Sequence, residues 1–236
     1  MQKLSLLWLV LLLSACNTVS TQPRPANYAA EVAAAAQSLQ SQGALLASDA
    51  AVMSDAELQR LLAYQVTLPP QSRIAILSLG QQTWAGWSDE FTQLNAQFET
   101  NFIAVLRAAP AIYDASYLPS LLTPEKRTAP YLREAAARYQ ADLLFMYRTT
   151  CNTYEKYRLF GADETKAYCT VEAVVLDTRS GIVPFTSVGT ETFAAKKGQD
   201  DLNFAETRRK AEMTAISAAL GQIAPDFVKF IEARRK

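Results

Sequence analysis

Hydrophobic residues follow two different spacings along this chain, and the order of the spacings predicts a mixed α/β domain. Short apolar or alternating runs bounded by turn residues predict strands at 73–80, 112–118, 142–150, 171–177 and 182–194. Apolar residues three or four positions apart predict helices at 54–68, 88–107, 128–139 and 203–224. This order favours an α/β fold, an α+β sandwich in which a mixed β-sheet of about five strands is packed by helices.

The strands at 142–150 and 171–177 are expected to form an antiparallel hairpin. Cys151 and Cys169 lie at their facing ends. If the two cysteines are opposite each other, Tyr147 falls opposite Ala173, and the apolar runs pair along their length. A turn at 178–181 then leads into the next strand.

The last predicted helix carries a proline within its apolar pattern. Pro225 is expected to kink or interrupt the helix, and Phe227, Phe230 and Ile231 continue its apolar face. The preceding loop contains Asp200 and Asp201, which are predicted to be solvated rather than to bind a cation, because no ligand pattern surrounds them.

Charge and composition exclude several functions. The chain has 23 basic and 23 acidic residues, so no basic surface favours nucleic acid as a partner. It has no histidine, which removes the commonest general base and zinc ligand. We therefore expect no enzyme, metal or cofactor. A hydrolase using Ser with Lys, or paired carboxylates, is the least favoured reading, since Asp142 and Asp177 are explained by roles at strand ends.

The N-terminus has the pattern of an export signal. A positive start is followed by an apolar stretch at 4–13 and by Leu13-Ser14-Ala15-Cys16, which resembles a bacterial lipobox. The resemblance implies that residues 1–15 are a signal peptide and that Cys16 is lipidated. Asn17, in place of Asp, implies an outer-membrane lipoprotein whose domain faces the periplasm or is exposed at the surface. The alternative is an ordinary secretory signal with an accidental cysteine.

The rest of the chain divides by composition. Residues 16–27 contain two prolines and polar residues, as expected of a flexible tether. Residues 28–50 have a thin apolar stripe and are expected to be a loosely docked helical segment. Residues 51–236 are expected to be a single periplasmic domain.

The cysteine count agrees with this compartment. Removing the lipidated Cys16 from three cysteines leaves Cys151 and Cys169 in an oxidising environment. We predict a disulfide between them, which would stabilise the fold by about 3 kcal/mol in the chain-entropy model.

Two aromatic segments are candidate partner-binding sites. The stretch between the cysteines contains Tyr154, Tyr157, Arg158 and Phe160, residue types that are enriched in interface hot spots. A solvated hairpin tip is the alternative. A loop after the first strand contains Trp84 and Trp87, which either bind a partner or fold back over the sheet edge.

The segments 154–160 and 165–172 resemble proteins called rhombotarget lipoproteins. The strand and turn motifs at 73–77, 141–144 and 174–183 are similar to a group of envelope lipoproteins that includes the curli secretion channel subunit and activators of penicillin-binding proteins. The resemblance implies a fold and no catalytic residue. The missing histidine and the missing nucleophile motifs favour a protein-binding accessory or assembly factor that is held at the membrane by its lipid.

The alternative is a homo-oligomeric secretion-channel subunit of the curli type. A pore would need a hairpin of alternating residues from each subunit to line a barrel. The segment 152–168 is too short and too charged for that role, so a partner-binding module is the preferred hypothesis.

Overall fold

The computed structural model describes residues 54–80, 88–159 and 161–235. All of them belong to one compact unit, Leu45–Lys236. The predicted signal peptide, tether, 28–50 segment and lipidated Cys16 lie outside the described residues, as do Trp84, Trp87 and Phe160.

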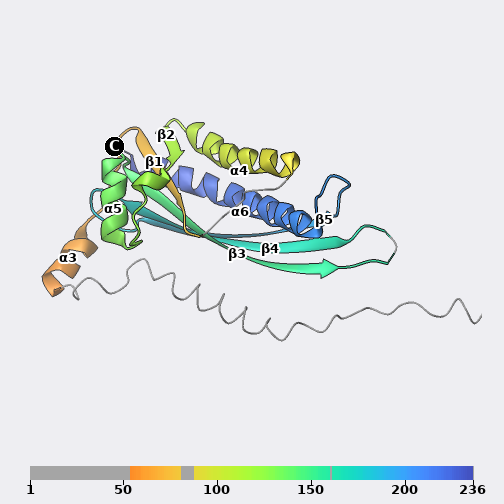
Figure 1. The fold of residues 1–236 in the computed structure, drawn as a ribbon. Coiled ribbons are helices and arrows are strands. Elements are labelled where there is room, and N and C mark those ends of the chain that lie inside the picture. The colour runs from red at the N-terminus through yellow and green to blue at the C-terminus, as the bar shows by residue number, and fades with distance from the viewer. Residues whose placement is uncertain (1–53, 81–87, 160, 236) are drawn as a thin grey trace, which may run out of the picture. The chain divides into compact units, whose positions relative to one another are not determined.

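Helices and strands alternate along the first half of the unit and are followed by a meander of three strands and a final helix (Figure 1). In order they are α3 Asp55–Ala63, β1 Ser72–Ser78, α4 Asp89–Arg107, β2 Ile112–Tyr117, the 3₁₀ turn η1 Ser120–Leu122, α5 Ala129–Arg138, β3 Leu143–Lys156, β4 Glu164–Asp177, β5 Phe185–Lys196 and α6 Phe204–Arg234.

The five strands form one mixed sheet in the order β2-β1-β3-β4-β5. β1 is parallel to both of its neighbours, β2 and β3. β4 is antiparallel to both of its neighbours, β3 and β5. The predicted fold class, a mixed five-stranded sheet packed by helices, is therefore confirmed.

The predicted hairpin register is also confirmed. Cys151 is opposite Cys169 and Tyr147 is opposite Ala173. The two cysteines form a disulfide, with their Cα atoms 4.2 Å apart. Both strands continue beyond the cysteines to Lys156 and Glu164, so β3 is longer than the 142–150 run predicted for it.

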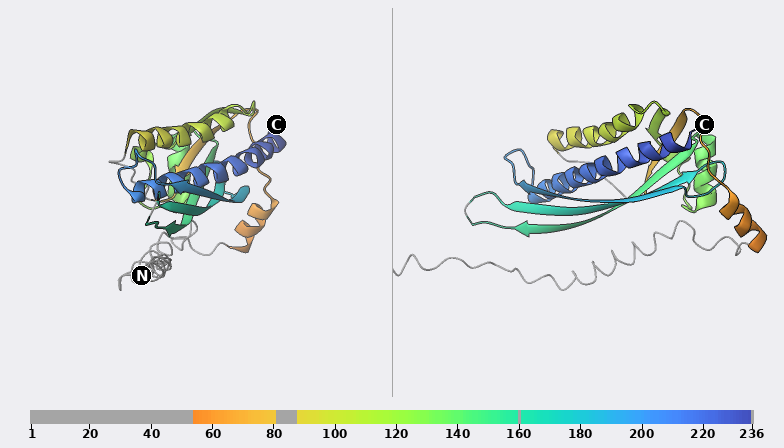
Figure 2. Two further views of the ribbon diagram at one scale, coloured as in Figure 1. Left: turned by 90° about the vertical axis from the view of Figure 1, so that its right-hand side faces the viewer. Right: turned by 180° about the vertical axis from the view of Figure 1, so that it is seen from behind.

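Helices cover the two faces of the sheet unequally (Figure 2). α4 and α6 lie on one face, where Ile74, Ile76 and Phe145 belong to the larger core. α5 lies on the other face and packs on Ala75 and Leu77 near one end of the sheet. Beyond α5, no helix of the described residues covers this second face of β3, β4 and β5, which we call the open face.

α6 is one continuous helix of 31 residues that runs through Pro225, so the predicted interruption is wrong. Phe227 and Ile231 are both fully buried beyond the proline, and the Phe227 ring lies 5.1 Å from Phe145 and 5.4 Å from Phe185. Burial of these side chains against the sheet favours continuing the helix despite the missing N–H of proline.

α6 packs closely against β5 at Gly189. A Cβ atom at this position would lie 2.7 Å from the main-chain oxygen of Ala219. Only glycine lets the helix backbone approach the strand this closely. No helix in the described part of the chain is both long and apolar enough to cross a membrane.

Candidate functional site

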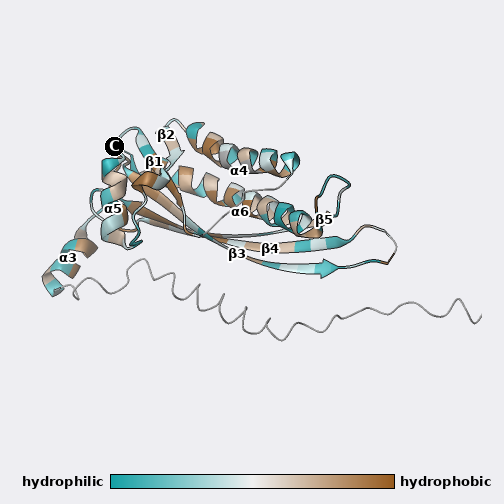
Figure 3. Cartoon of the chain, viewed as in Figure 1, coloured by the Kyte–Doolittle hydropathy of each residue, from teal (hydrophilic) through white to brown (hydrophobic). Residues whose placement is uncertain are grey.

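Exposed aromatic and aliphatic side chains gather where β3 and β4 extend past the disulfide, at residues 154–166, which we call the ribbon end. Tyr154 is 66% exposed, Tyr157 65% and Leu159 79%. Arg158 lies beside them. Figure 3 shows that the strands change from apolar near α5 to polar toward this end. Three of the predicted partner-binding residues, Tyr154, Tyr157 and Arg158, thus lie at one end of the hairpin, with the Tyr154 ring against Tyr168 and the Tyr157 ring against Phe204 of α6.

The start of α6 supports the ribbon end from one face. The Tyr157 ring lies 5.3 Å from the Phe204 ring, and its hydroxyl donates a hydrogen bond to Glu155. That bond to a carboxylate, assisted by partial burial, raises the pKa of Tyr157. Arg208 of α6 forms an ion pair with Glu155 at 3.0 Å. The ribbon end is therefore tied to the helix rather than held by β3 and β4 alone.

A hollow of about 410 Å³ lies at the same end, and we assign it to the open face because no residue of α6 lines it. Two rows of side chains border it, each crossing three strands. Tyr154, Lys166 and Ala194 are register partners in one row, and Lys156, Glu164 and Lys196 are partners in the other. The row between them, residues 155, 165 and 195, points to the α6 face, since side chains alternate along a strand. It therefore borders the hollow through its main chain.

Positive charge exceeds negative charge around this hollow. Glu164 accepts hydrogen bonds from Arg158 at 2.9 Å and pairs with Lys196 at 3.4 Å. Desolvation would raise the pKa of Glu164, but the bonds from Arg158 and Lys196 outweigh it and lower the pKa. Lys156 and Lys166 have no carboxylate partner among the described residues.

Aromatic rings continue the hollow along the open face. The Lys166 ammonium lies 4.8 Å from the centre of the Tyr168 ring. Tyr168 meets Tyr154 edge to face, with ring centres 5.5 Å apart. The arrangement combines ammonium groups that have no carboxylate partner among the described residues with aromatic surface, which suits a ligand or partner that is both anionic and partly apolar.

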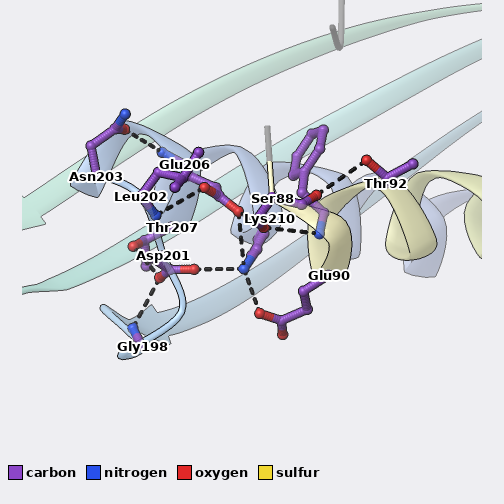
Figure 4. A network of polar contacts seen from close by, with 11 residues as sticks. Ser88, Glu90, Thr92, Gly198, Asp201, Leu202, Asn203, Glu206, Thr207 and Lys210 are labelled. Atoms are coloured by element: carbon purple, nitrogen blue, oxygen red, sulfur yellow. Dashed lines mark hydrogen bonds and ion pairs between the residues drawn. The ribbon is translucent and has the colours of Figure 1, made fainter. Parts of the chain in front are cut away.

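A second group of charges lies at the other end of the β5–α6 connection, and we call it the Lys210 cluster (Figure 4). The Lys210 Nζ atom lies 2.5 Å from Asp201, 2.6 Å from Glu90 and 3.2 Å from Glu206. The side chains of Asp201 and Glu206 are 4% and 0% exposed. Asp201 was expected to be solvated, and that prediction is wrong because Lys210 neutralises it inside the fold.

Hydrogen bonds satisfy the buried carboxylates. Asp201 accepts from Thr207 and from the Gly198 N–H at 2.6 and 2.9 Å, and Glu206 accepts from Ser88 and from the Leu202 N–H. These bonds and Lys210 lower the pKa of both carboxyls against the opposing effect of burial.

The same contacts determine what Lys210 can do chemically. Burial lowers its pKa, but bonds to Asp201, Glu90 and Glu206 outweigh burial and raise the pKa above its ordinary value. Lys210 therefore remains protonated near neutral pH and is unsuited to activate Ser88 as a general base. The cluster joins α4, the loop before α6 and α6 itself, which is a structural role.

The carboxylates at the strand ends have the entry and turn roles expected from the sequence. Asp142 accepts from the Arg73 N–H at 2.9 Å and from Arg179 at 2.7 Å. Asp177 accepts from the Ser180 N–H at 2.8 Å in the turn to β5. Within the described ranges, no group of three or more acidic or cysteine side chains is placed to hold a metal ion.

Sequence reasoning missed the contributions of Tyr168, Lys166 and Lys196 to the ribbon end. Lys196 belongs to β5, and only the register of three strands places it in one row with Glu164 and Lys156. The signal available in the sequence was the two-residue alternation of 164, 166 and 168, which puts these side chains on one face.

No protein-family model matches the chain, and no curated protein matches it. Among solved structures, a hypothetical protein from Chlamydia trachomatis aligns with a TM-score of 0.41 and 10% identity, covering 69% of this chain and 99% of that one.

Two further structures align less closely. A minor lipoprotein from Acinetobacter baumannii has a TM-score of 0.30 and 9% identity, covering 70% of this chain and 94% of that one. A PelC dodecamer from Paraburkholderia phytofirmans has a TM-score of 0.31 and 17% identity, covering 66% and 95%. Likenesses of this size assign the chain neither a family nor a function.

Proposed function

We propose that this chain is a lipid-anchored envelope lipoprotein without enzymatic activity, and that it binds a protein partner through the ribbon end as an accessory or assembly factor. The lipobox-like sequence ending at Cys16 supports the anchor and the outer-membrane location. The observation that carries the binding role is the exposure of Tyr154, Tyr157 and Leu159 together at one end of a supported hairpin.

The physical reason is that such a surface can bind at low entropic cost. Aromatic residues and arginine supply much of the binding energy in protein interfaces. The disulfide and the contacts of Glu155 and Tyr157 with α6 hold the ribbon end before a partner arrives. A surface that is ordered in advance loses less freedom on binding.

Site-specific photocrosslinking in intact cells tests the binding role. A photoreactive phenylalanine analogue replaces Tyr154 in one variant and Tyr113 in a matched control, since Tyr113 is also exposed, at 56%, but lies on β2. We expect a discrete product from position 154 that is absent from position 113. Identical products from both positions, or none from position 154, would refute the binding role. A product of twice the chain mass would assign the ribbon end to self-assembly instead.

The anchor has its own test. Replacing Cys16 with alanine removes the residue that would carry the lipid. We expect the Cys16→Ala protein to leave the membrane fraction after extraction at high pH, whereas the wild type stays. Retention of the variant in the outer-membrane fraction would contradict the lipid anchor.

A further inference from the structure

We infer that the hollow at the ribbon end takes an acidic, extended polypeptide segment of the partner. This inference rests on the proposed function and specifies the partner's chemistry. The segment would place carboxylates at Lys156 and Lys166 and an apolar side chain against Tyr154 and Ala194, all of which border the hollow.

The charges favour an anionic occupant. Lys156, Lys166 and Lys196 border the hollow, and Glu164 is the one carboxylate that the open face contributes to its border. Glu164 is already shared between Arg158 and Lys196. Since Lys156 and Lys166 have no carboxylate partner among the described residues, two ammonium groups remain available on a chain whose formal net charge is zero.

The shape and chemistry of the hollow favour side chains over a simple ion. Its volume of about 410 Å³ falls in the range of about 300–1,000 Å³ typical of ligand pockets. Tyr154 and Ala194 give it apolar surface beside the ammonium groups. A segment that alternates acidic and apolar residues would meet both kinds of surface.

The edge of the sheet favours a polypeptide in extended form. β5 is the last strand in the sheet order, and no strand of the described residues pairs with its outer side. Ala194 and Lys196 belong both to this edge strand and to the border of the hollow. A segment could therefore add to the β5 main chain, as in strand-addition recognition, and then cross the open face to reach Lys166 on β4 and Lys156 on β3.

Peptide binding to the full-length lipoprotein in detergent micelles tests the inference. The probe is a fluorescent ten-residue peptide of alternating Glu and Val, compared with a peptide of alternating Gln and Val. Fluorescence anisotropy is measured for the wild type, for Lys156→Glu with Lys166→Glu, and for a control with the same charge change, Lys126→Glu with Lys229→Glu.

We expect the acidic peptide to bind the wild type and the control equally, and to bind the ribbon variant about tenfold more weakly, because two attractive pairs become repulsive. Added salt should weaken this binding. Equal binding of the Gln peptide, or equal weakening in the control, would overturn the inference. If the ribbon variant has lost its circular dichroism spectrum, Lys156→Gln with Lys166→Gln replaces it, with a smaller loss expected.

Other occupants give different results. Stronger association with phosphatidylglycerol vesicles than with uncharged phosphatidylcholine vesicles, lost in the ribbon variant, would assign the lysines to a membrane surface and overturn the inference. Self-association of the wild type in sedimentation, abolished by the two ribbon substitutions, would assign them to a second copy of the chain and overturn it as well.

The photocrosslink at position 154 shows whether a negative result contradicts this inference alone or the proposed function as well. If Lys156→Glu with Lys166→Glu removes the crosslink that the otherwise wild-type protein forms, the acidic chemistry is supported. If the crosslink survives the charge reversal, the chain binds a partner but the inferred chemistry is wrong. If position 154 never crosslinks, the proposed function itself fails.

Discussion

Replacing Lys210 with methionine should destabilise the protein more than any exposed lysine substitution. Methionine keeps the length and much of the apolar stem but removes the ammonium group. Asp201 and Glu206 would then be left as buried carboxylates without their shared cation, at 4% and 0% exposure. Glu90, which is 66% exposed, remains hydrated and contributes little to the effect.

The expected loss is about 3 kcal/mol, at the low end of the 3–5 kcal/mol typical of breaking a buried ion pair. The low end is appropriate because each carboxylate keeps two other donors. Asp201 keeps Thr207 and the Gly198 N–H, and Glu206 keeps Ser88 and the Leu202 N–H. A loss of this size lowers the equilibrium constant for folding by roughly 150-fold.

Urea unfolding followed by circular dichroism measures this loss. With an m-value of about 3 kcal/mol/M, the midpoint should fall by about 1 M. The matched control is Lys229→Met in the same helix, because Lys229 is 75% exposed and pairs with an exposed Asp226. That variant should change the free energy of unfolding by less than about 0.5 kcal/mol.

A second substitution checks the cause. Glu206→Gln added to Lys210→Met removes one of the uncompensated buried charges, so it should recover part of the lost stability. Equal midpoints for Lys210→Met and Lys229→Met, or further loss in the double variant, would refute the reasoning that the cluster is a buried, charge-balanced joint.

Three further predictions concern stability. Gly189→Ala should lower the free energy of unfolding by about 1–3 kcal/mol, because its Cβ meets the α6 main chain. Gly221→Ala has open space around it and should raise the free energy of unfolding by about 0.5–1 kcal/mol. Urea midpoints that shift in the same direction for both variants would contradict this. Replacing Cys151 and Cys169 with alanine should cost about 3 kcal/mol, and a reducing agent should then no longer affect the thermal midpoint, as it does in wild type. The carboxyls of Asp201 and Glu206 have pKa values below their ordinary 3.8 and 4.5. The stability that they contribute is therefore present above pH 4.5 and is lost as the pH falls through the lowered pKa values. A free energy of unfolding that does not change in this acid range would contradict this.

Local patterns predicted most of the elements, and the contacts between distant segments explain what they missed. The β3–β4 register followed from the positions of two cysteines and two apolar runs. The placement of β1 between β2 and β3 depends on the packing of α4 and α5 on opposite faces, which no local pattern records. The polar ends of β3 and β4 gave no apolar run, so their length was underestimated.

In the candidate site, too, local patterns pointed to some residues, while others depend on contacts between distant segments. Tyr154, Tyr157 and Arg158 were predicted because aromatic residues and arginine stand close together in the sequence. Asp201 was wrongly predicted to be solvated because its burial depends on the turn that returns the chain to α6. Lys196 was missed because it reaches the hollow from a third strand.

The order in which the chain is made has a consequence for its folding. α6 follows all five strands, yet it supplies the cover for the apolar face of β4, including Ala167, Val171 and Val175, which are fully buried in the finished fold. Until the residues around Phe227 have been synthesised, the apolar face of β4 lacks the cover that α6 supplies. Before α6 is made, the strands therefore expose apolar side chains, and a chain that stops before α6 should bind chaperones or aggregate.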